Sequence, residues 1–431
     1  MINYIDKYID KNFIWLEDNL KALIRENSIN IPPKGLENNA QKVIENIFIS
    51  IGLNVDRFSP DYVKGFKDSE HYLKGRDYSN RDNIVGYTGA DKSKVLIFNG
   101  HIDTVPSNEF KWKKTSPFTP FIEGNKMYGL GSGDMKGGLL SAVFALKSII
   151  DLGIDIKGKV IIQSVVDEEF GGGNGTISCI KKGYIGDYAI IPEPTFMDLE
   201  ISNISSEVLI FNIKGTEGIG YIEKSRETVN PIIVCVGLIN VLKDYENYLN
   251  SLKNKYSLYK DIKKPINFLF SDIRGGENGI DKVITNPGSC TLRAYLMNYP
   301  EYSKEEFEKL LINFIKNYPD IYKYFEDSHI EYVTSNRFTE GMNFNLNINE
   351  NKKFIEILQN NSKEVLNKRL NTSAFLSGSD AFAFPKLGKT NAILLGPGGG
   401  NFHAADEFVY LNDLKNLSKI FARLIFDLCC E

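Results

Sequence analysis

The chain has 431 residues and a formal net charge of −4, and 42% of its residues are hydrophobic and 25% charged. This is the composition of a soluble globular protein, and the small negative charge excludes a broad basic surface for nucleic acid or for an anionic membrane. A chain of this length exceeds one ordinary hydrophobic core, so we expect two domains.

The first twenty residues place Asp and Lys between apolar residues at helical spacing. This pattern predicts an amphipathic helix and not a signal peptide. No run is long and apolar enough to span a bilayer. The five cysteines form no CxxC pair and no regular framework, and their odd number favours a reducing compartment. We therefore expect a cytoplasmic protein.

Four short apolar runs predict strands of one sheet, at residues 94–98, 159–166, 187–191 and 392–396. The polar clusters NGHID, DEEFGGG, PEPT and PGGGNFHAADE follow these runs in that order. A nearly all-apolar helix is expected at 133–150, between the first two runs. Strands that alternate with helices predict an α/β fold with a mostly parallel sheet. Ligands of such sheets bind beyond the carboxyl ends of the strands, so the polar clusters can converge on one site.

Residues 206–327 have a different pattern. It predicts a strand, a helix, two strands and a final helix, which is opened by a capping box from Ser303 to Glu306. This order resembles a ferredoxin-like α+β unit. Because the segment separates two runs expected in one sheet, we interpret it as a domain inserted into a catalytic domain made of 1–205 and 328–431.

Two of the four histidines, His101 and His403, lie in the strand-end clusters. Imidazole is an ordinary zinc ligand, although a histidine in a surface loop is the alternative for each. Asp103 follows His101 at a spacing that lets it accept the second ring N–H and fix the tautomer, as metal-binding histidines usually require.

Asp134 lies at the start of the helix expected at 133–150. Capping that helix is the simplest role for an aspartate there, and a carboxylate that caps can also bind a metal. The glycines around Asp134 do not form a P-loop, because no GKS or GKT follows them.

Glu168 and Glu169 stand side by side at the end of an apolar run, where like charges repel. A divalent cation would offset that repulsion. Glu193 lies between two prolines, which suits a rigid ligand but also a stiff turn. Two histidines and several carboxylates at strand ends suit two divalent ions held about 3.5–4 Å apart. Zn²⁺ is the expected metal, and Co²⁺ and Mn²⁺ are the alternatives. The alternative is a scatter of solvated side chains.

The motifs NGHIDTVP, GSGDMKGG, DEEFGGGNGT, PEPT, GSDAFAF and GPGGGNFHAADEFV occur in the order and at the spacing of a known family. The chain resembles the co-catalytic zinc amidohydrolases that include acetylornithine deacetylase, succinyl-diaminopimelate desuccinylase, aminoacylase and carboxypeptidase G. The resemblance covers essentially the whole chain. It implies that Asp134 bridges two metal ions, with His101 and Glu193 completing one site and Glu169 and His403 the other.

The resemblance also implies roles for residues beside the ligands. Asp103 would orient His101, and Glu168 would act as the general base that later delivers its proton to the leaving amine. The inserted domain corresponds to the lid of the family, which in many members is also the interface of a homodimer.

One lid position departs from the family pattern. Many relatives carry a histidine that helps to hold the oxyanion, and Ile219 stands at that position here. Without that histidine the contact that it usually makes between subunits is not expected, so the oligomeric state stays open. Arg293 matches a lid arginine that would bind a substrate carboxylate, although a surface arginine is the alternative. Gly378 and Ser379 match a loop that meets the substrate.

The leading functional hypothesis is hydrolysis of an amide bond in a small N-acylated amino acid or related amine, as by a deacetylase or desuccinylase. A di- or tripeptidase of the same family is the alternative. A non-catalytic binding protein on this fold is a third hypothesis, motivated by Ile219. The ligand set and Glu168 argue against the third, and the sequence does not name the substrate.

Overall fold

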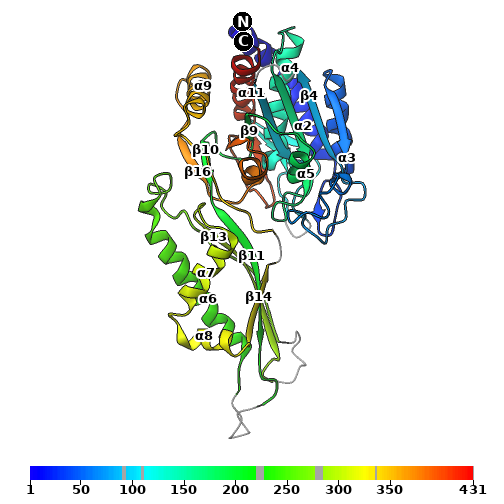
Figure 1. Cartoon of the computed structure of the whole chain (residues 1–431). Helices are drawn as coiled ribbons and strands as arrows, with labels where there is room; N and C mark the ends of the chain where they lie inside the picture. The colour runs from blue at the N-terminus through cyan, green and yellow to red at the C-terminus, as the bar shows by residue number, and fades with distance from the viewer. Residues whose placement is uncertain (90–93, 108–110, 220–227, 277–284, 335–336, 431) are drawn as a thin grey trace. The chain divides into compact units, whose positions relative to one another are not determined.

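The computed structural model describes residues 1–89, 94–107, 111–219, 228–276, 285–334 and 337–430. The chain forms two compact units, which are described separately (Figure 1). The first unit comprises Met1–Ser202, Met342–Phe375 and Ser379–Glu431, and the second comprises Asn203–Gly341 and Leu376–Gly378.

The first unit contains the main sheet, in the order β15-β10-β17-β9-β5-β8-β4-β3. Its four central strands are parallel and correspond to the four apolar runs of the sequence. They are β17 (Asn391–Leu394), β9 (Tyr188–Ile191), β5 (Val95–His101) and β8 (Lys159–Val165). The mostly parallel sheet expected from the sequence is thus confirmed for the strands that carry the polar clusters.

The outer strands run antiparallel to their inner neighbours where β4 meets β8, β3 meets β4 and β10 meets β17. Their bounds are β3 (Asn54–Phe58), β4 (Asn83–Gly89) and β10 (Leu199–Asn203). β15 (Met342–Asn343) follows β10 at the edge, and β16 (Thr372–Phe375) also pairs with β10.

Helices cover both faces of this sheet, because neighbouring residues of a strand point to opposite faces. On one face the ring of Phe98 lies 4.9 Å from that of Phe421, between centroids. On the other face Ile97 belongs to a buried cluster with Cys179 and Phe384. The first face is covered by α3 (Asn38–Ser50), α4 (Gly137–Asp151) and α11 (Leu411–Ile425), and the second by α5 (Gly175–Lys181) and α10 (Ala383–Leu387). Each large apolar side chain buried here contributes about 1.5–3 kcal/mol to folding.

The amphipathic N-terminus forms two helices where the sequence suggested one. They are α1 (Ile2–Asn12) and α2 (Ile14–Arg25), with a break at Phe13. The side chain of Arg423 in α11 anchors α1 through a two-pronged ion pair with Asp6. α9 (Asn349–Leu366) packs against α11 as well.

The helix expected at 133–150 begins later, at Gly137, and its N-cap residue is Lys136. The interpretation of Asp134 as the helix cap is therefore wrong. Residues 132–136 form an irregular turn in which the backbone of Asp134 is not helical, with φ −119° and ψ 91°. Asp134 is thereby free to face other partners.

Gly138 lets α4 approach the segment that follows β9. A Cβ atom at this position would lie 2.0 Å from the carbonyl oxygen of Pro192, the residue before Glu193. We expect Gly138→Ala to lower the free energy of unfolding by about 1–3 kcal/mol, the usual cost of overpacking. Urea denaturation measures this loss. Gly124→Ala is the control for adding a methyl group where nothing lies within 4 Å, although its positive φ brings strain of its own. Equal urea midpoints for Gly138→Ala and wild type would contradict the close approach of α4 to Pro192.

Two smaller sheets complete the first unit. One has the order β18-β19-β7-β6 and joins residues near His403 to the segment before Asp134. Its strands are β6 (Phe121–Glu123), β7 (Lys126–Tyr128), β18 (Gly399–Gly400) and β19 (Phe408–Tyr410). The other is the hairpin of β1 (Asn30–Ile31) and β2 (Lys34–Gly35). Short helical turns occupy Pro60–Tyr62 and Asp380–Phe382, and Phe426–Cys430 continues α11.

The second unit is an antiparallel sheet in the order β12-β13-β11-β14, packed with helices. This order and chain path are those of a ferredoxin-like unit, as expected. Ser303 and Glu306 form the expected capping box. The boundary expected at residue 327 falls before β14, which belongs to this unit because it pairs with β11. The elements are β11 (Ser205–Lys214), α6 (Pro231–Ser251), a turn at Lys253–Lys255, β12 (Leu269–Gly275), β13 (Ser289–Asn298), α7 (Lys304–Ile315), α8 (Pro319–Glu326) and β14 (Ile330–Thr334).

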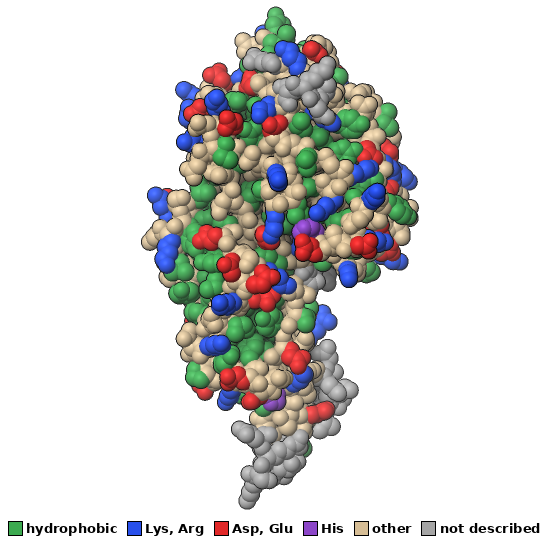
Figure 2. All heavy atoms as spheres, viewed as in Figure 1, with side chains coloured by type: hydrophobic (Ala, Val, Ile, Leu, Met, Phe, Trp, Pro, Cys, Tyr) green, Lys and Arg blue, Asp and Glu red, His purple; other side chains and the backbone are tan. Residues whose placement is uncertain are grey.

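The surface carries mixed charge. On the face shown in Figure 2, Lys and Arg side chains alternate with Asp and Glu. Across the part of the chain that the structure describes, no helix is long and apolar enough to cross a membrane. All five cysteines are buried and free of disulfide bonds.

Candidate metal centre

The carboxyl ends of the central strands bring together residues that are far apart in the sequence. His101 is the last residue of β5, and Glu168 and Glu169 follow the end of β8. Glu193 lies just beyond β9. His403 follows β18, in the turn that leads to β19. The topology therefore assembles the polar clusters at one edge of the sheet, as parallel strands require.

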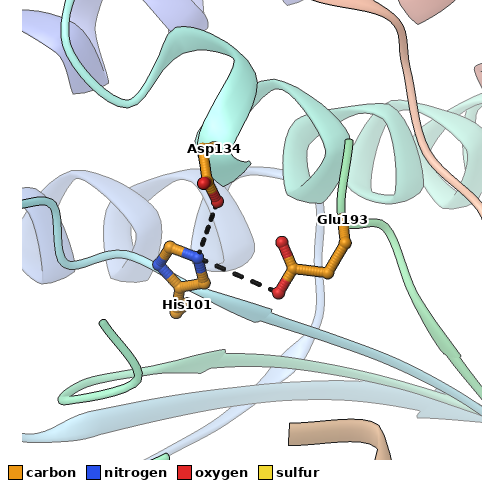
Figure 3. Close-up of side chains that lie close together, drawn as sticks. All are labelled: His101, Asp134 and Glu193. Carbon is orange, nitrogen blue, oxygen red and sulfur yellow. Dashed lines mark hydrogen bonds and ion pairs between the residues drawn. The ribbon is translucent and has the colours of Figure 1, made fainter. Parts of the chain in front are cut away.

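His101, Asp134 and Glu193 form a first group, drawn in Figure 3. The Nε2 atom of His101 lies 3.1 Å from Oδ1 of Asp134 and 4.0 Å from Oε1 of Glu193. All three side chains point toward one another, and His101 is only 1% exposed. One nitrogen and two carboxylates can therefore face a single small cation.

Asp134, Glu169 and His403 form a second group. The Nε2 atom of His403 lies 2.9 Å from Oε2 of Glu169 and 3.3 Å from Oδ2 of Asp134. The two oxygens of Asp134 are thus divided between the groups, Oδ1 toward His101 and Oδ2 toward His403. The side chain of His403 is 52% exposed, so the second group is open to solvent.

Glu407 holds the turn that carries Asp134. Its two carboxylate oxygens accept hydrogen bonds from the backbone N–H groups of Gly131, Gly133 and Asp134, at 2.9, 2.9 and 3.1 Å. Glu407 is 1% exposed. Burial raises its pKa to about 8, and the charge of Asp134 adds to that rise, while the three amide hydrogen bonds oppose it. Glu407 was not among the expected site residues, although it lies in the same motif as His403.

Asp103 contacts His101 differently from the expectation. The Nδ1 atom of His101 lies 2.9 Å from the backbone carbonyl oxygen of Asp103 and 3.7 Å from its carboxylate. The carboxylate is occupied elsewhere: Oδ1 accepts from the backbone N–H of Glu168 and Oδ2 from that of Glu169, both at 3.1 Å. Asp103 therefore orients the imidazole with its backbone and the two glutamates with its side chain.

The two groups hold three acidic side chains and two histidines. Burial raises the pKa of Glu169, and burial together with the charge of Asp134 raises that of Glu193 well above its usual range. Burial alone would raise the pKa of Asp134 too, but hydrogen bonds from His101 and His403 hold it well below its usual range. A centre with this charge balance favours cations.

The acids in turn raise the pKa of both histidines. The charge of Glu169 raises the pKa of His403 to about 12, against the effect of burial. Burial would lower the pKa of His101, but the hydrogen bond with Asp134 and the charge of Glu193 raise it well above its ordinary value. Both imidazoles thus take up positive charge that a divalent ion would supply when bound.

Glu168 belongs to neither group of candidate ligands. Burial raises the pKa of its carboxyl well above the ordinary value, partly offset by the charge of His101. The charges of Asp380 and Glu193 raise it further. Asp380 is itself held by a 2.5 Å hydrogen bond from the hydroxyl of Thr176.

The expected substrate-contacting residues divide between the two units. Arg293 on β13 and Gly378 lie in the second unit, where the N–H of Gly378 donates to the hydroxyl of Tyr295 at 3.2 Å. Ile219 is in the same unit and is 39% exposed. Ser379 is in the first unit, and its hydroxyl accepts from the N–H of Ala381 at 3.3 Å.

The donor set fits a pair of divalent ions. Each group supplies one imidazole nitrogen and carboxylate oxygens that lie within 4.8 Å of one another. Imidazole and carboxylate are ligands of zinc, and also of manganese and cobalt. Each group, called a ligand group below, offers three candidate protein ligands, and catalytic zinc sites usually leave a further position for water or substrate.

Comparison with known proteins agrees with this chemistry. An uncharacterized metallohydrolase of Methanocaldococcus jannaschii is 26% identical, over 94% of this chain and 97% of that protein. A succinyl-diaminopimelate desuccinylase of Buchnera aphidicola is 27% identical, over 81% of this chain and 88% of that protein. A solved di-peptidase from Saccharomyces cerevisiae shares the fold, with a TM-score of 0.76, 15% identity, and coverage of 99% of this chain and 98% of that one.

The model of peptidase family M20/M25/M40 matches residues 97–427. That range begins in β5 and ends just after α11, so it includes every residue of the two ligand groups. The resemblance drawn from the motifs is therefore confirmed, and the chain is a hydrolase. By sequence and by fold, it belongs to peptidase family M20/M25/M40.

Proposed function

We propose that this chain hydrolyses the amide bond of a small N-acylated amino acid or related amine, with two divalent metal ions at the candidate metal centre. The observation that carries the proposal is the pair of three-residue ligand groups that share Asp134. Sharing of one carboxylate is the arrangement that two-metal hydrolytic sites use. Zn²⁺ is the first choice for both positions, because imidazole and carboxylate complete its coordination without cysteine.

His101, Asp134 and Glu193 would hold one ion, and Asp134, Glu169 and His403 the other. When bound, the ions supply Lewis acidity that polarises the scissile carbonyl and eases deprotonation of water. Glu168 accepts the proton of the attacking water and then donates it to the nitrogen of the leaving amine.

Support for a deacylase comes from the desuccinylase of Buchnera aphidicola, which this chain resembles over most of its length. The fold shared with the yeast di-peptidase keeps a peptidase as the second candidate. Arg293 is proposed to bind a carboxylate of the substrate, as a bidentate partner. Gly378 and Ser379 are proposed to contact the substrate through the loop after β16.

A substrate panel separates the two candidates. We expect the Zn²⁺-loaded protein to release free amine from N-succinyl or N-acetyl amino acids faster than it cleaves dipeptides of matched side chains. Amine release is measured with a ninhydrin-type assay, and the metal content of the same sample is determined by mass spectrometry. Turnover of dipeptides alone would refute the deacylase assignment and establish the peptidase.

A further inference from the structure

Asp167, the first acid of the run Asp167–Glu169, is fully buried. Its side chain is 0% exposed, and its backbone adopts a φ of 67°. The carboxylate accepts hydrogen bonds from Tyr78 at 2.5 Å and from Nη2 of Arg81 at 3.2 Å. The Nε atom of Arg76 lies 3.5 Å from Oδ2 of Asp167. Burial of an acid at this depth requires such partners.

Arg81 links this cluster to the start of α3. Its guanidinium also pairs with Glu37, just before α3, with Nη2 2.6 Å from Oε1 and Nε 2.9 Å from Oε2. Arg81 is 1% exposed and Glu37 is fully buried. A planar guanidinium held by two carboxylates is a rigid anchor.

Asn30 connects the cluster to the candidate metal centre. Its amide nitrogen donates to Oδ2 of Asp103 at 2.9 Å and to Oδ1 of Asp167 at 3.0 Å. An amide has two N–H groups, and each carboxylate receives one. If the amide were flipped, its oxygen would face the carboxylates of Asp103 and Asp167, which cannot donate. These two carboxylates therefore fix the orientation of the Asn30 amide. The Oδ1 atom of Asn30 has no hydrogen-bond partner in the described part of the chain.

The carboxylate of Asp103 in turn contacts the backbone of Glu168 and Glu169. The oxygen that accepts from Asn30 also accepts from the N–H of Glu169, and the other oxygen accepts from the N–H of Glu168. A small rotation of the Asp103 carboxylate would therefore move both glutamates. Neither Asn30 nor Asp167 belongs to a ligand group.

We infer that Asn30 and Asp167 are positioning residues that act through Asp103 to set the directions of Glu168 and Glu169. This inference rests on the proposed function where it concerns turnover, but not where it concerns metal binding. Loss of a residue that orients ligands from behind typically costs about 10–100-fold in metal affinity or activity. If these residues served stability alone, the folded variants would keep the metal affinity and the activity of wild type.

The test compares Asn30→Ala and Asn30→Leu with wild type. Both variants lose the two donated hydrogen bonds, and leucine keeps most of the side-chain volume. We expect the Zn²⁺ dissociation constant, measured by chelator competition, to rise about 10–100-fold in both. We expect kcat to fall by a similar factor, with KM within about twofold of wild type. Asn351→Ala is the matched control, because Asn351 in α9 is a buried asparagine whose side-chain nitrogen donates to the carbonyl oxygen of Asn345 and to Oδ1 of Asn391, and neither of these belongs to a ligand group.

Wild-type Zn²⁺ affinity and kcat in both folded Asn30 variants would overturn the inference. If neither variant folds, Tyr78→Phe decides in their place, because it removes only the hydroxyl that contacts Asp167 and Asn174. We then expect a loss of about tenfold in Zn²⁺ affinity, and an unchanged affinity overturns the inference. If wild type binds Zn²⁺ but cleaves nothing in the substrate panel, the proposed function fails, and the affinity measurements still decide the inference.

Discussion

Replacement of Glu168 by alanine is expected to lower kcat by about 10²–10⁴-fold, the usual contribution of a general acid–base residue. Metal content and KM should stay near those of wild type, because Glu168 belongs to neither ligand group. The expectation follows from the place of Glu168 next to Glu169 in the chain and from the burial of its carboxyl among the charges of His101, Asp380 and Glu193. Steady-state kinetics with metal analysis of the same sample make the measurement.

The matched control for this variant is Glu200→Ala. Glu200 is a glutamate on β10 that is 7% exposed and lies outside both ligand groups, so its replacement should leave kcat unchanged. Unchanged turnover in Glu168→Ala would refute the proton-transfer role. Loss of one metal ion from that variant would instead identify Glu168 as a ligand.

Asp134→Ala is expected to abolish binding at both metal positions and, with it, all measurable hydrolysis. Asp134 is the one residue common to the two groups, and its two oxygens face different histidines. Glu193→Ala and His403→Ala each remove a ligand from a single group. We therefore expect each of these two variants to keep one tightly bound ion per chain and Asp134→Ala to keep none.

Inductively coupled plasma mass spectrometry after dialysis against metal-free buffer counts the ions. Circular dichroism of the same samples controls for unfolding. Two ions retained by Asp134→Ala would contradict the bridging role. Equal loss of both ions from Glu193→Ala would show that the two positions do not bind independently.

The sequence was sufficient to place the central strands and the ligand clusters. Each apolar run ends in residues that cannot be buried without a partner, and the alternation with helices predicts that these strands are parallel, although it does not predict their order in the sheet. His101 and His403 stood out because the chain has only four histidines. The family pattern then related them to the acids between them.

Backbone detail could not be predicted in the same way. The irregular turn at 132–136 carries Asp134 away from the helix, and three backbone N–H groups that donate to Glu407 help to hold that turn. Asn30 gave no signal, because its role depends on two acids 73 and 137 residues away in the chain. Asp167 stands directly before Glu168 and Glu169, and that position does not distinguish a buried anchor from a residue of the turn. Its buried partners Tyr78 and Arg81 come from a loop without any motif.

The most direct test of the account is a titration of the metal-free protein with Zn²⁺, followed by hydrolysis of the best substrate in the panel. The two ligand groups predict that turnover is absent without metal and reaches its maximum at two equivalents of Zn²⁺ per chain. Full turnover of the metal-free protein, verified by mass spectrometry, would contradict the account.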